Sequence, residues 1–288
     1  SCYYVPVPPP RSKGKQAEFQ EFKEIGIEEN EFINQVRSRV RIWRSKDYPG
    51  VTSTTRKLLN HWTNPTKERK LFYCQIEAVE TAIYIAEIAG RNSDGWIETD
   101  LRKANDDNNP GLFRIALKMA TGSGKTVVMS MLIAWQALNK QSNRQDARFT
   151  DKFLLVTPGI TIRDRLNVLL PSNPGNYYAE RDILPPGYMD KIGQAKIVIL
   201  NYHSFMPRET VEAGKLVKSV LRGDFKETPA QMVTRVTREL GGAKSQIIVI
   251  NDEAHHCYRQ KVEDVADLSG EDKKEAEERN RYARVWIS

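Results

Sequence analysis

Four short apolar runs, each followed by polar residues, divide the second half of the chain. They are Ile115 to Met119, Phe153 to Val156, Ile197 to Leu200, and Ile247 to Ile250. Continuous runs of this length, rich in β-branched residues, are typical of strands buried on both faces. Helical segments lie between them, and alternating strands and helices predict a parallel sheet. The expected fold class is therefore α/β, with a parallel β-sheet flanked by helices.

The first half of the chain shows helical spacing instead. Phe32, Val36 and Val40 share one face of a helix predicted from Glu21 to Trp43. A second helix is predicted from Val51 to Trp62, with Thr54, Arg56 and Lys57 outward, and a third from Phe72 to Ala89, with Ala86 inward and Gly90 as its end. We expect residues 1–58 to form an arm and helical extension, and residues 59–288 to form the main lobe.

Three polar segments complete the predicted layout. Residues 1–15 contain a proline-rich stretch and predict an extended arm. Residues 91–110, rich in Asn and Asp, predict a surface loop with one short helical turn, and residues 173–193 predict a connector. Further on, Glu227 to Leu240 predicts a helix closed by Gly241 and Gly242, and residues 271–281 predict a solvated charged helix.

Each apolar run in the second half ends in a polar cluster. The carboxyl ends of parallel strands lie on one edge of a sheet, and that edge is where ligands bind in α/β folds. Unrelated polar turns would have no reason to fall there four times. The sequence therefore predicts one composite site at this edge.

Composition narrows the choices only moderately. The 288 residues carry a formal net charge of +7, which favours a polyanionic partner without requiring one. No segment has the apolar length of a membrane span and no secretory signal is visible, so we expect a cytoplasmic protein without membrane contact. Three scattered cysteines exclude a disulfide framework, and the adjacent His255, His256 and Cys257 are poorly spaced for zinc.

The sequence from Thr121 to Thr126 is a candidate phosphate-binding loop. Gly122 and Gly124 allow the backbone to turn so that successive N–H groups face a phosphate chain, with Ser123 between them. Lys125 would place a positive charge at the β- and γ-phosphates, and the Thr126 hydroxyl would bind Mg²⁺. The general pattern has glycine where this chain has Met119, and the alternative is a flexible Gly/Ser turn.

A second candidate group follows the last apolar run, in the sequence Asn251-Asp-Glu-Ala-His255. Asp252, at the end of the strand, could hold Mg²⁺ through its water shell. Glu253 could orient and deprotonate the water that attacks the γ-phosphate. The two acids would therefore have separate roles.

Ala-Thr-Gly-Ser-Gly-Lys-Thr followed by Asp-Glu-Ala-His resembles motifs I and II of superfamily 2 helicases and translocases. Longer stretches are similar to the ATPase (Res-type) subunit of type III restriction enzymes: Leu71 to Ala78, Lys118 to Lys140, Val156 to Gly159, Asn201 to His203, and Asn251 to Tyr258. The resemblance implies a RecA-like P-loop NTPase lobe, ATP and Mg²⁺ as ligands, duplex DNA as a partner, and a modification or nuclease subunit. It also implies that His255 links the metal site to a second lobe.

The resemblance assigns further residues. Gln75 would select adenine, because a Gln amide can donate to adenine N7 and accept from N6; the alternative is a surface Gln on an amphipathic helix. Thr157, Pro158, Gly159 and Arg163 would grip a nucleic-acid backbone. Asn201 to Ser204 would be the companion contact, with Asn201 and Tyr202 as the residues that touch the strand. The alternative for Arg163 and Arg165 is a solvated helix face.

The leading hypothesis is an ATP-driven DNA translocase or helicase motor. Two alternatives stay open: a regulatory nucleotide-binding switch that does not move on DNA, and an RNA helicase. The resemblance implies a Ser-Ala-Thr motif and an Arg-rich motif after the acids, and the chain contains neither. We therefore expect a piece of a longer protein, which binds ATP but hydrolyses it poorly.

Overall fold

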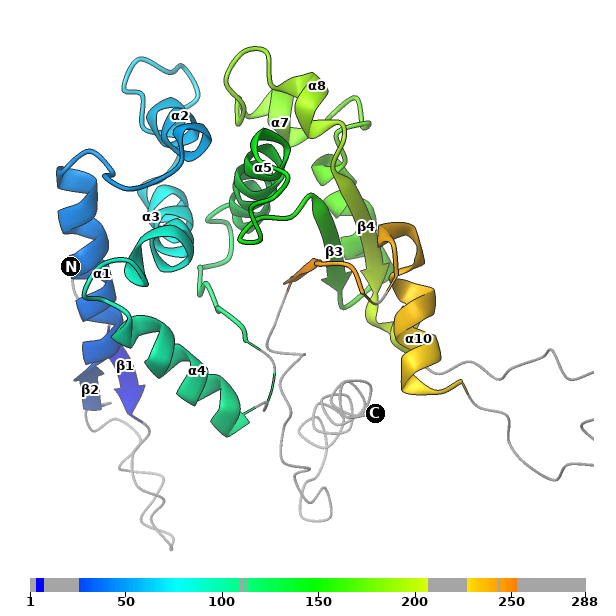
Figure 1. Cartoon of the computed structure of the whole chain (residues 1–288), viewed down its shortest axis with the longest axis horizontal. Coiled ribbons are helices and arrows are strands. Elements are labelled where there is room, and N and C mark those ends of the chain that lie inside the picture. The colour runs from blue at the N-terminus through cyan, green and yellow to red at the C-terminus, as the bar shows by residue number, and fades with distance from the viewer. Residues whose placement is uncertain are drawn as a thin grey trace, which may run out of the picture.

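A computed structural model describes residues 4–7, 26–108, 111, 113–206, 227–242 and 244–252. The first half holds β1 (Tyr4–Val7), β2 (Gly26–Glu29), α1 (Glu31–Ser45), α2 (Ser53–Trp62), α3 (Tyr73–Ile83), the π-helix η2 (Tyr84–Ala89) and α4 (Trp96–Asn108). The second half holds α5 (Lys125–Ser142), β3 (Lys152–Thr157), α6 (Ile160–Arg165), η3 (Leu166–Leu169), α7 (Tyr177–Glu180), α8 (Met189–Ile192), β4 (Lys196–Asn201), η4 (Tyr202–Phe205), α10 (Pro229–Val236), η5 (Arg238–Leu240) and β5 (Ile248–Asn251). Figure 1 shows their arrangement.

Three of the four predicted strands are confirmed, and they form one parallel sheet in the order β4-β3-β5. The register pairs Thr157 with Asn201, and Val156 with Asn251. All three strands therefore end at one edge of the sheet. The prediction that the polar clusters lie at one edge of the sheet is therefore confirmed for these three strands.

The strand predicted from Ile115 to Met119 is wrong. Residues 113–120 belong to no strand ladder of the described chain, and Figure 1 shows them as a green coil between α4 and α5. Just before this segment, the Asn105 side chain makes the backbone hydrogen bonds that a neighbouring strand would make. Its amide oxygen accepts from Arg114 N at 3.0 Å, and its amide nitrogen donates to Arg114 O at 2.9 Å. Apolar periodicity cannot reveal such side-chain competition.

Alternate residues of β3 face two different clusters. Phe153 and Leu155 belong to the main hydrophobic cluster, which includes much of α5, whereas Leu154 and Val156 pack with Phe205, Val236 and Leu240. The strand is therefore covered on both faces, as a parallel sheet requires. Helix α5 is apolar on most of its circumference, which is typical of a helix enclosed by its neighbours.

The helical extension differs from the prediction at its start. Residues 26–29 form β2, antiparallel to β1, and the helix begins only at Glu31, because the Asn30 side chain accepts a hydrogen bond from Ile33 N at 3.0 Å. Helix α2 matches the predicted segment, but Thr54 points inward and donates to Ser142 Oγ at 2.9 Å. Its predicted outward position is wrong, because the hydroxyl has a polar partner on α5.

The loop predicted for residues 91–110 is also wrong for most of its length. Helix α4 occupies Trp96–Asn108, with Ile97 fully buried in the main cluster and Leu101 packed against it. These two apolar residues stabilise a helix despite the low helix propensity of the Asn and Asp residues around them. The connector at residues 173–193 contains the two short helices α7 and α8.

The predicted helix from Glu227 to Leu240 is confirmed as α10 followed by η5, with Gly241 in the left-handed region at φ +93°. Residues 271–281 lie outside the described residues. Helix α2 runs across residue 58, and the division into residues 1–58 and 59–288 stays a prediction. No helix in the described ranges has the length and apolar character needed to cross a membrane.

Candidate functional site

The glycine loop has the backbone geometry that a phosphate cradle requires. Gly122 and Gly124 lie in the left-handed region, at φ +78° and +82°, which favours glycine. Ser123 closes the turn, because its Oγ donates to Ala120 O at 2.6 Å. The next residue, Lys125, begins the 18-residue helix α5, and Thr126 lies in its first turn. A Cβ placed on Gly122 would meet nothing within 4 Å, so the space beside this glycine is open.

Gln75 bridges the third predicted helix to this loop. Its Nε2 donates to Ser123 O at 2.9 Å and its Oε1 accepts from Phe72 N at 2.9 Å. A Cβ on Gly124 would lie 2.2 Å from Gln75 Nε2, so a larger residue there would displace the Gln75 amide, in addition to the strain at its positive φ. Gln75 is only 4% exposed, which excludes the alternative of a surface glutamine.

Two aromatic residues beside Gln75 were missed by the sequence analysis. Phe72 and Tyr73 are 61% and 58% exposed, whereas the helical spacing placed Phe72 in the core. Tyr73 is held from α1, since Arg44 Nη1 donates to its hydroxyl at 3.2 Å and the guanidinium lies 5.2 Å from its ring centroid. The sequence feature that could have identified them is the pair of adjacent aromatic residues shortly before Gln75.

Arg44 also anchors α1 on α3. Its Nε donates to Glu80 Oε1 at 2.9 Å, and Glu80 is fully buried and accepts from Tyr48 as well, at 2.6 Å. The hydrogen bond from Arg44 to Glu80 raises the pKa of the guanidinium, so Arg44 stays charged. Burial and the bond to Glu80 raise the pKa of Tyr48. These contacts fix the helix whose first turn carries Gln75.

The strand ends carry the second group of predicted site residues. Asp252 follows β5 directly, and its N–H donates to Val156 O at 3.0 Å, which extends the ladder by one step. Asp252 therefore lies at the same edge as Thr157 and Asn201. Beside it, Asn251 Oδ1 is buried and accepts no hydrogen bond from the described chain. Glu253 and His255 lie outside the described residues, and their roles stay predictions.

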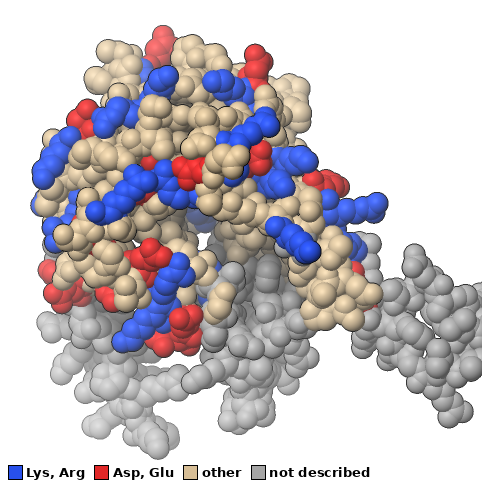
Figure 2. Space-filling view, in the orientation of Figure 1, with Lys and Arg blue, Asp and Glu red and all other residues tan. Residues whose placement is uncertain are grey.

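The predicted nucleic-acid contacts differ in exposure. The Thr157 hydroxyl is buried and donates to Gly159 O at 3.0 Å, which shapes the turn through Pro158 into α6. Arg163 and Arg165 are exposed near the end of α6. Figure 2 shows Lys and Arg spread over the visible face with Asp and Glu among them.

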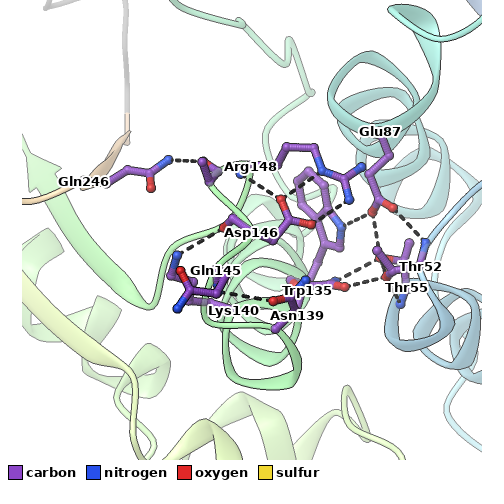
Figure 3. A network of polar contacts seen from close by, with 12 residues as sticks. Thr52, Thr55, Glu87, Trp135, Asn139, Lys140, Gln145, Asp146, Arg148 and Gln246 are labelled. Atoms are coloured by element: carbon purple, nitrogen blue, oxygen red, sulfur yellow. Dashed lines mark hydrogen bonds and ion pairs between the residues drawn. The ribbon is translucent and has the colours of Figure 1, made fainter.

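A buried polar network joins α2 and η2 to α5 (Figure 3). The Glu87 carboxylate accepts from Thr52 N at 3.0 Å, Thr55 Oγ1 at 2.6 Å and Trp135 Nε1 at 2.8 Å. Asn139 donates to Thr55 Oγ1 at 2.9 Å and accepts from the Thr52 hydroxyl at 2.5 Å. The helix that begins at Lys125 is thus fixed to the N-terminal extension along its second half.

Groups of His, Cys, Asp and Glu able to hold a metal by themselves are absent from the part of the chain that the structure describes.

Comparison with known proteins supports the sequence resemblance. The family model described as "Type III restriction enzyme, res subunit" matches residues 68–276, which is more than half of the 288-residue chain. No curated protein and no solved structure matches the chain. The matched region contains the glycine loop, all three strands of the parallel sheet and both predicted acids. The chain therefore belongs to the type III restriction enzyme res-subunit family, and it carries that family's RecA-like, helicase-type ATPase domain.

Proposed function

We propose that this chain is the first motor lobe of an ATP-dependent DNA translocase of a restriction system. The observation that carries the proposal is the contact between Gln75 and the glycine loop. This contact joins Gln75, whose amide is suited to adenine recognition, to the glycine loop before α5, whose backbone is suited to phosphate binding. Nucleotide recognition and phosphate binding are thereby parts of one site.

The phosphate chain would lie over the left-handed glycines, where backbone N–H groups and the amino end of α5 favour negative charge. Lys125 would contact the β- and γ-phosphates as a point charge. The open space over Gly122 supports this placement, because nothing within 4 Å of a Cβ there would obstruct a ligand. The glycine loop, the amino end of α5 and Lys125 would all act on phosphate charge that the nucleotide carries before it reacts. This part of the site would therefore contribute to nucleotide binding.

Thr126 and Asp252 are the proposed Mg²⁺ contacts, through a hydroxyl and a carboxylate, which are oxygen donors of the kind that Mg²⁺ prefers. The buried oxygen of Asn251, next to Asp252, accepts no hydrogen bond within the described residues and would add a further acceptor for a metal-bound water. When bound, Mg²⁺ would neutralise charge that develops on the β- and γ-phosphate oxygens. Glu253 would take the proton from the attacking water.

Gln75 keeps enough hydrogen-bonding capacity to read adenine while it stays on the loop. An amide has two N–H donors and two acceptor lone pairs. One donor is used on Ser123 O and one lone pair by Phe72 N, so one of each remains. This remaining pair matches adenine N7 and the N6 amino group. The exposed rings of Phe72 and Tyr73 lie beside it and could cover the base.

Nucleic acid would run along the carboxyl edge of the sheet. The turn from Thr157 to Gly159 offers backbone groups, Arg163 offers charge, and Asn201 ends the neighbouring strand. Contacts of this kind grip the backbone and do not read sequence. We infer that a modification or nuclease subunit supplies the recognition and cleavage that these residues do not.

The test is ATP binding by this chain and its slow ATPase turnover, each measured with duplex DNA or duplex RNA and compared with the value without polymer. A translocase should bind Mg²⁺-ATP and respond more strongly to DNA than to RNA. The Glu253→Gln variant should bind ATP normally, and its ATP turnover should be abolished. A response to neither polymer would favour the regulatory switch, and a stronger response to RNA would favour an RNA helicase.

A further inference from the structure

Helix α1 is rich in arginine and lies outside the region that the family model matches, which begins at residue 68. Its sequence holds four arginines and a single acid. Three of the arginines form ion pairs with acids of other elements: Arg37 with Glu77, Arg44 with Glu80, and Arg39 with Asp94. The exposed Arg41 forms no ion pair within the described residues, and it shares a face of α1 with Arg37 and Arg44, at spacings of four and three. This face therefore keeps an excess of positive charge.

The same face of α1 packs against one row of residues on α3, and Figure 1 shows the two helices side by side. Tyr73, Glu77 and Glu80 follow one another at spacings of four and three, and each is contacted by an arginine of α1. Gln75, which reaches the glycine loop, lies roughly 200° around the helix from Tyr73. Of the two exposed rings at the start of α3, Tyr73 is therefore the one on the side of α1.

The Tyr73 ring is held in place although the residue is 58% exposed. Its hydroxyl accepts from Arg44 Nη1 at 3.2 Å and donates to Glu77 Oε1 at 3.3 Å. The Arg44 guanidinium also lies 5.2 Å from the ring centroid. A ring fixed in this way loses little conformational freedom when a flat ligand stacks on it. Exposed aromatic rings are stacking surfaces for the bases of single-stranded nucleic acids, whereas the bases of a duplex are already stacked on one another.

Two further cations come shortly before this ring in the sequence. Arg69 and Lys70 are exposed and form no ion pair within the part of the chain that the structure describes, and Glu68 is the exposed acid beside them. Basic side chains that flank an exposed ring match a single strand, whose phosphates meet the cations while a base stacks on the ring.

We propose that α1 and the start of α3 bind a single strand of nucleic acid, with a base stacked on Tyr73 and phosphates at Arg41, Arg69 and Lys70. Arg44 is the positioning residue that holds the ring. The inference goes beyond the proposed function, which places nucleic acid at the carboxyl edge of the sheet, and it implies that the chain engages an unpaired strand. It also leaves Phe72 as the ring that would cover adenine.

The experiment measures the fluorescence anisotropy of a fluorescein-labelled oligothymidylate of about 20 nucleotides with the 288-residue chain, alongside Mg²⁺-ATP binding. Tyr73→Leu should weaken oligonucleotide binding about fivefold to hundredfold, because one stacked base is lost. ATP binding should be unchanged. Tyr188→Leu is the matched control, since it removes a ring that also lies near a cation, 4.9 Å from Lys191 Nζ, at the start of α8.

Salt dependence separates the contribution of the charges from that of the ring. Arg41→Ala and Lys70→Ala should each reduce the slope of log affinity against log salt by about 0.7, whereas Tyr73→Leu should leave the slope unchanged. Lys103→Ala, at an exposed position of α4, should leave both the affinity and the slope unchanged.

Arg44→Lys tests the positioning role, because lysine keeps the charge beside Glu80 but lacks the fork that also reaches the Tyr73 hydroxyl. It should weaken oligonucleotide binding about threefold, as should Tyr73→Phe, which removes the hydroxyl alone. The double variant should lose no more affinity than either single variant, since both changes release the same ring. Thermal melting would show that each variant is folded. Additive losses in the double variant would refute the positioning role of Arg44.

The outcomes separate this inference from the proposed function. A chain that binds Mg²⁺-ATP and duplex DNA but not the oligonucleotide would overturn the inference alone. Equal oligonucleotide affinity of Tyr73→Leu and wild type would do the same. A loss of ATP affinity in Tyr73→Leu with oligonucleotide binding intact would also overturn it and assign the ring to adenine. A chain that binds the oligonucleotide through Tyr73 but does not bind ATP would support the inference and overturn the proposed function.

Discussion

The two ends of helix α5 are held in opposite ways. In its second half, Trp135 and Asn139 lie in the buried network with Glu87 and the threonines of α2. Its first residue follows a glycine loop that is joined to α3 by the hydrogen bond from Gln75 to Ser123 O. The buried network holds the second half of α5 in a fixed position, while the backbone N–H groups of the glycine loop remain available to a ligand. Stability and ligand binding should therefore depend on different residues of one helix.

Glu87→Ala should have the largest effect, at the rigid end. The change leaves three buried donors unpaired and should lower the free energy of unfolding by about 3 to 5 kcal/mol, as measured by urea denaturation. Glu87→Gln is the matched control and should lose less, because one acceptor oxygen remains. The folded fraction should bind ATP normally. Reduced ATP affinity in fully folded Glu87→Ala would show that the two ends are not independent.

Lys125→Ala tests the glycine end. Removal of a charge-assisted phosphate contact should weaken ATP binding roughly tenfold to hundredfold, with little change in melting temperature. Lys118→Ala, which removes the same charge from an exposed position seven residues earlier, should bind ATP like wild type. Binding can be measured by calorimetry. Equal ATP affinity for Lys125→Ala and wild type would refute the phosphate assignment.

Gln75→Ala should reduce the preference for ATP over GTP by about tenfold, because the remaining donor and acceptor for adenine are lost. Gln35→Ala is the control, since this amide lies on α1 and donates to Glu31 at an exposed position. Competition of both nucleotides for a fluorescent ATP analogue gives the ratio. An unchanged ratio would assign Gln75 to shaping the loop alone.

The smallest effect concerns the turn that leads from α5 to β3. Arg148 lowers the pKa of Asp146 to about 2 through side-chain hydrogen bonds. A carboxylate whose pKa is lower in the folded state stabilises the fold above its unfolded pKa of about 4, and the contribution disappears as pH falls toward about 2. Asp146→Asn should therefore cost about 1 kcal/mol at neutral pH, after allowance for solvent screening. The difference from wild type should vanish in acid, and a difference independent of pH would exclude this ion pair as its cause.

The sheet and the glycine loop were predictable from sequence, because both depend on local pattern. Ile197 to Leu200 is a continuous apolar run, and the glycines have conformational requirements that other residues rarely meet. Long-range polar pairing was not predictable in the same way. Thr54 faces inward because Ser142 accepts its hydroxyl, and Asn105 pairs with the backbone at Arg114, where a strand was expected. Buried Glu80 and Glu87 have the residue type of a surface position and become core residues only through their partners.

The predicted site residues show the same difference between what local sequence pattern predicts and what long-range contacts determine. Gln75 was placed by resemblance, and the structure adds its contact with Ser123 O. The exposed Phe72 was not selected, because exposure depends on how a helix is phased against its neighbours, which periodicity gives only approximately.

The π-helix between Tyr84 and Ala89 sets that phase for the end of the third helical segment. Its wider turn brings Glu87 to the inward position and leaves Ala86 exposed, although regular spacing placed Ala86 in the core. One residue of register therefore decides whether a carboxylate or a methyl group meets Trp135. A single-residue deletion within this turn would disturb the anchoring of the nucleotide-binding helix more than most point substitutions at the same positions.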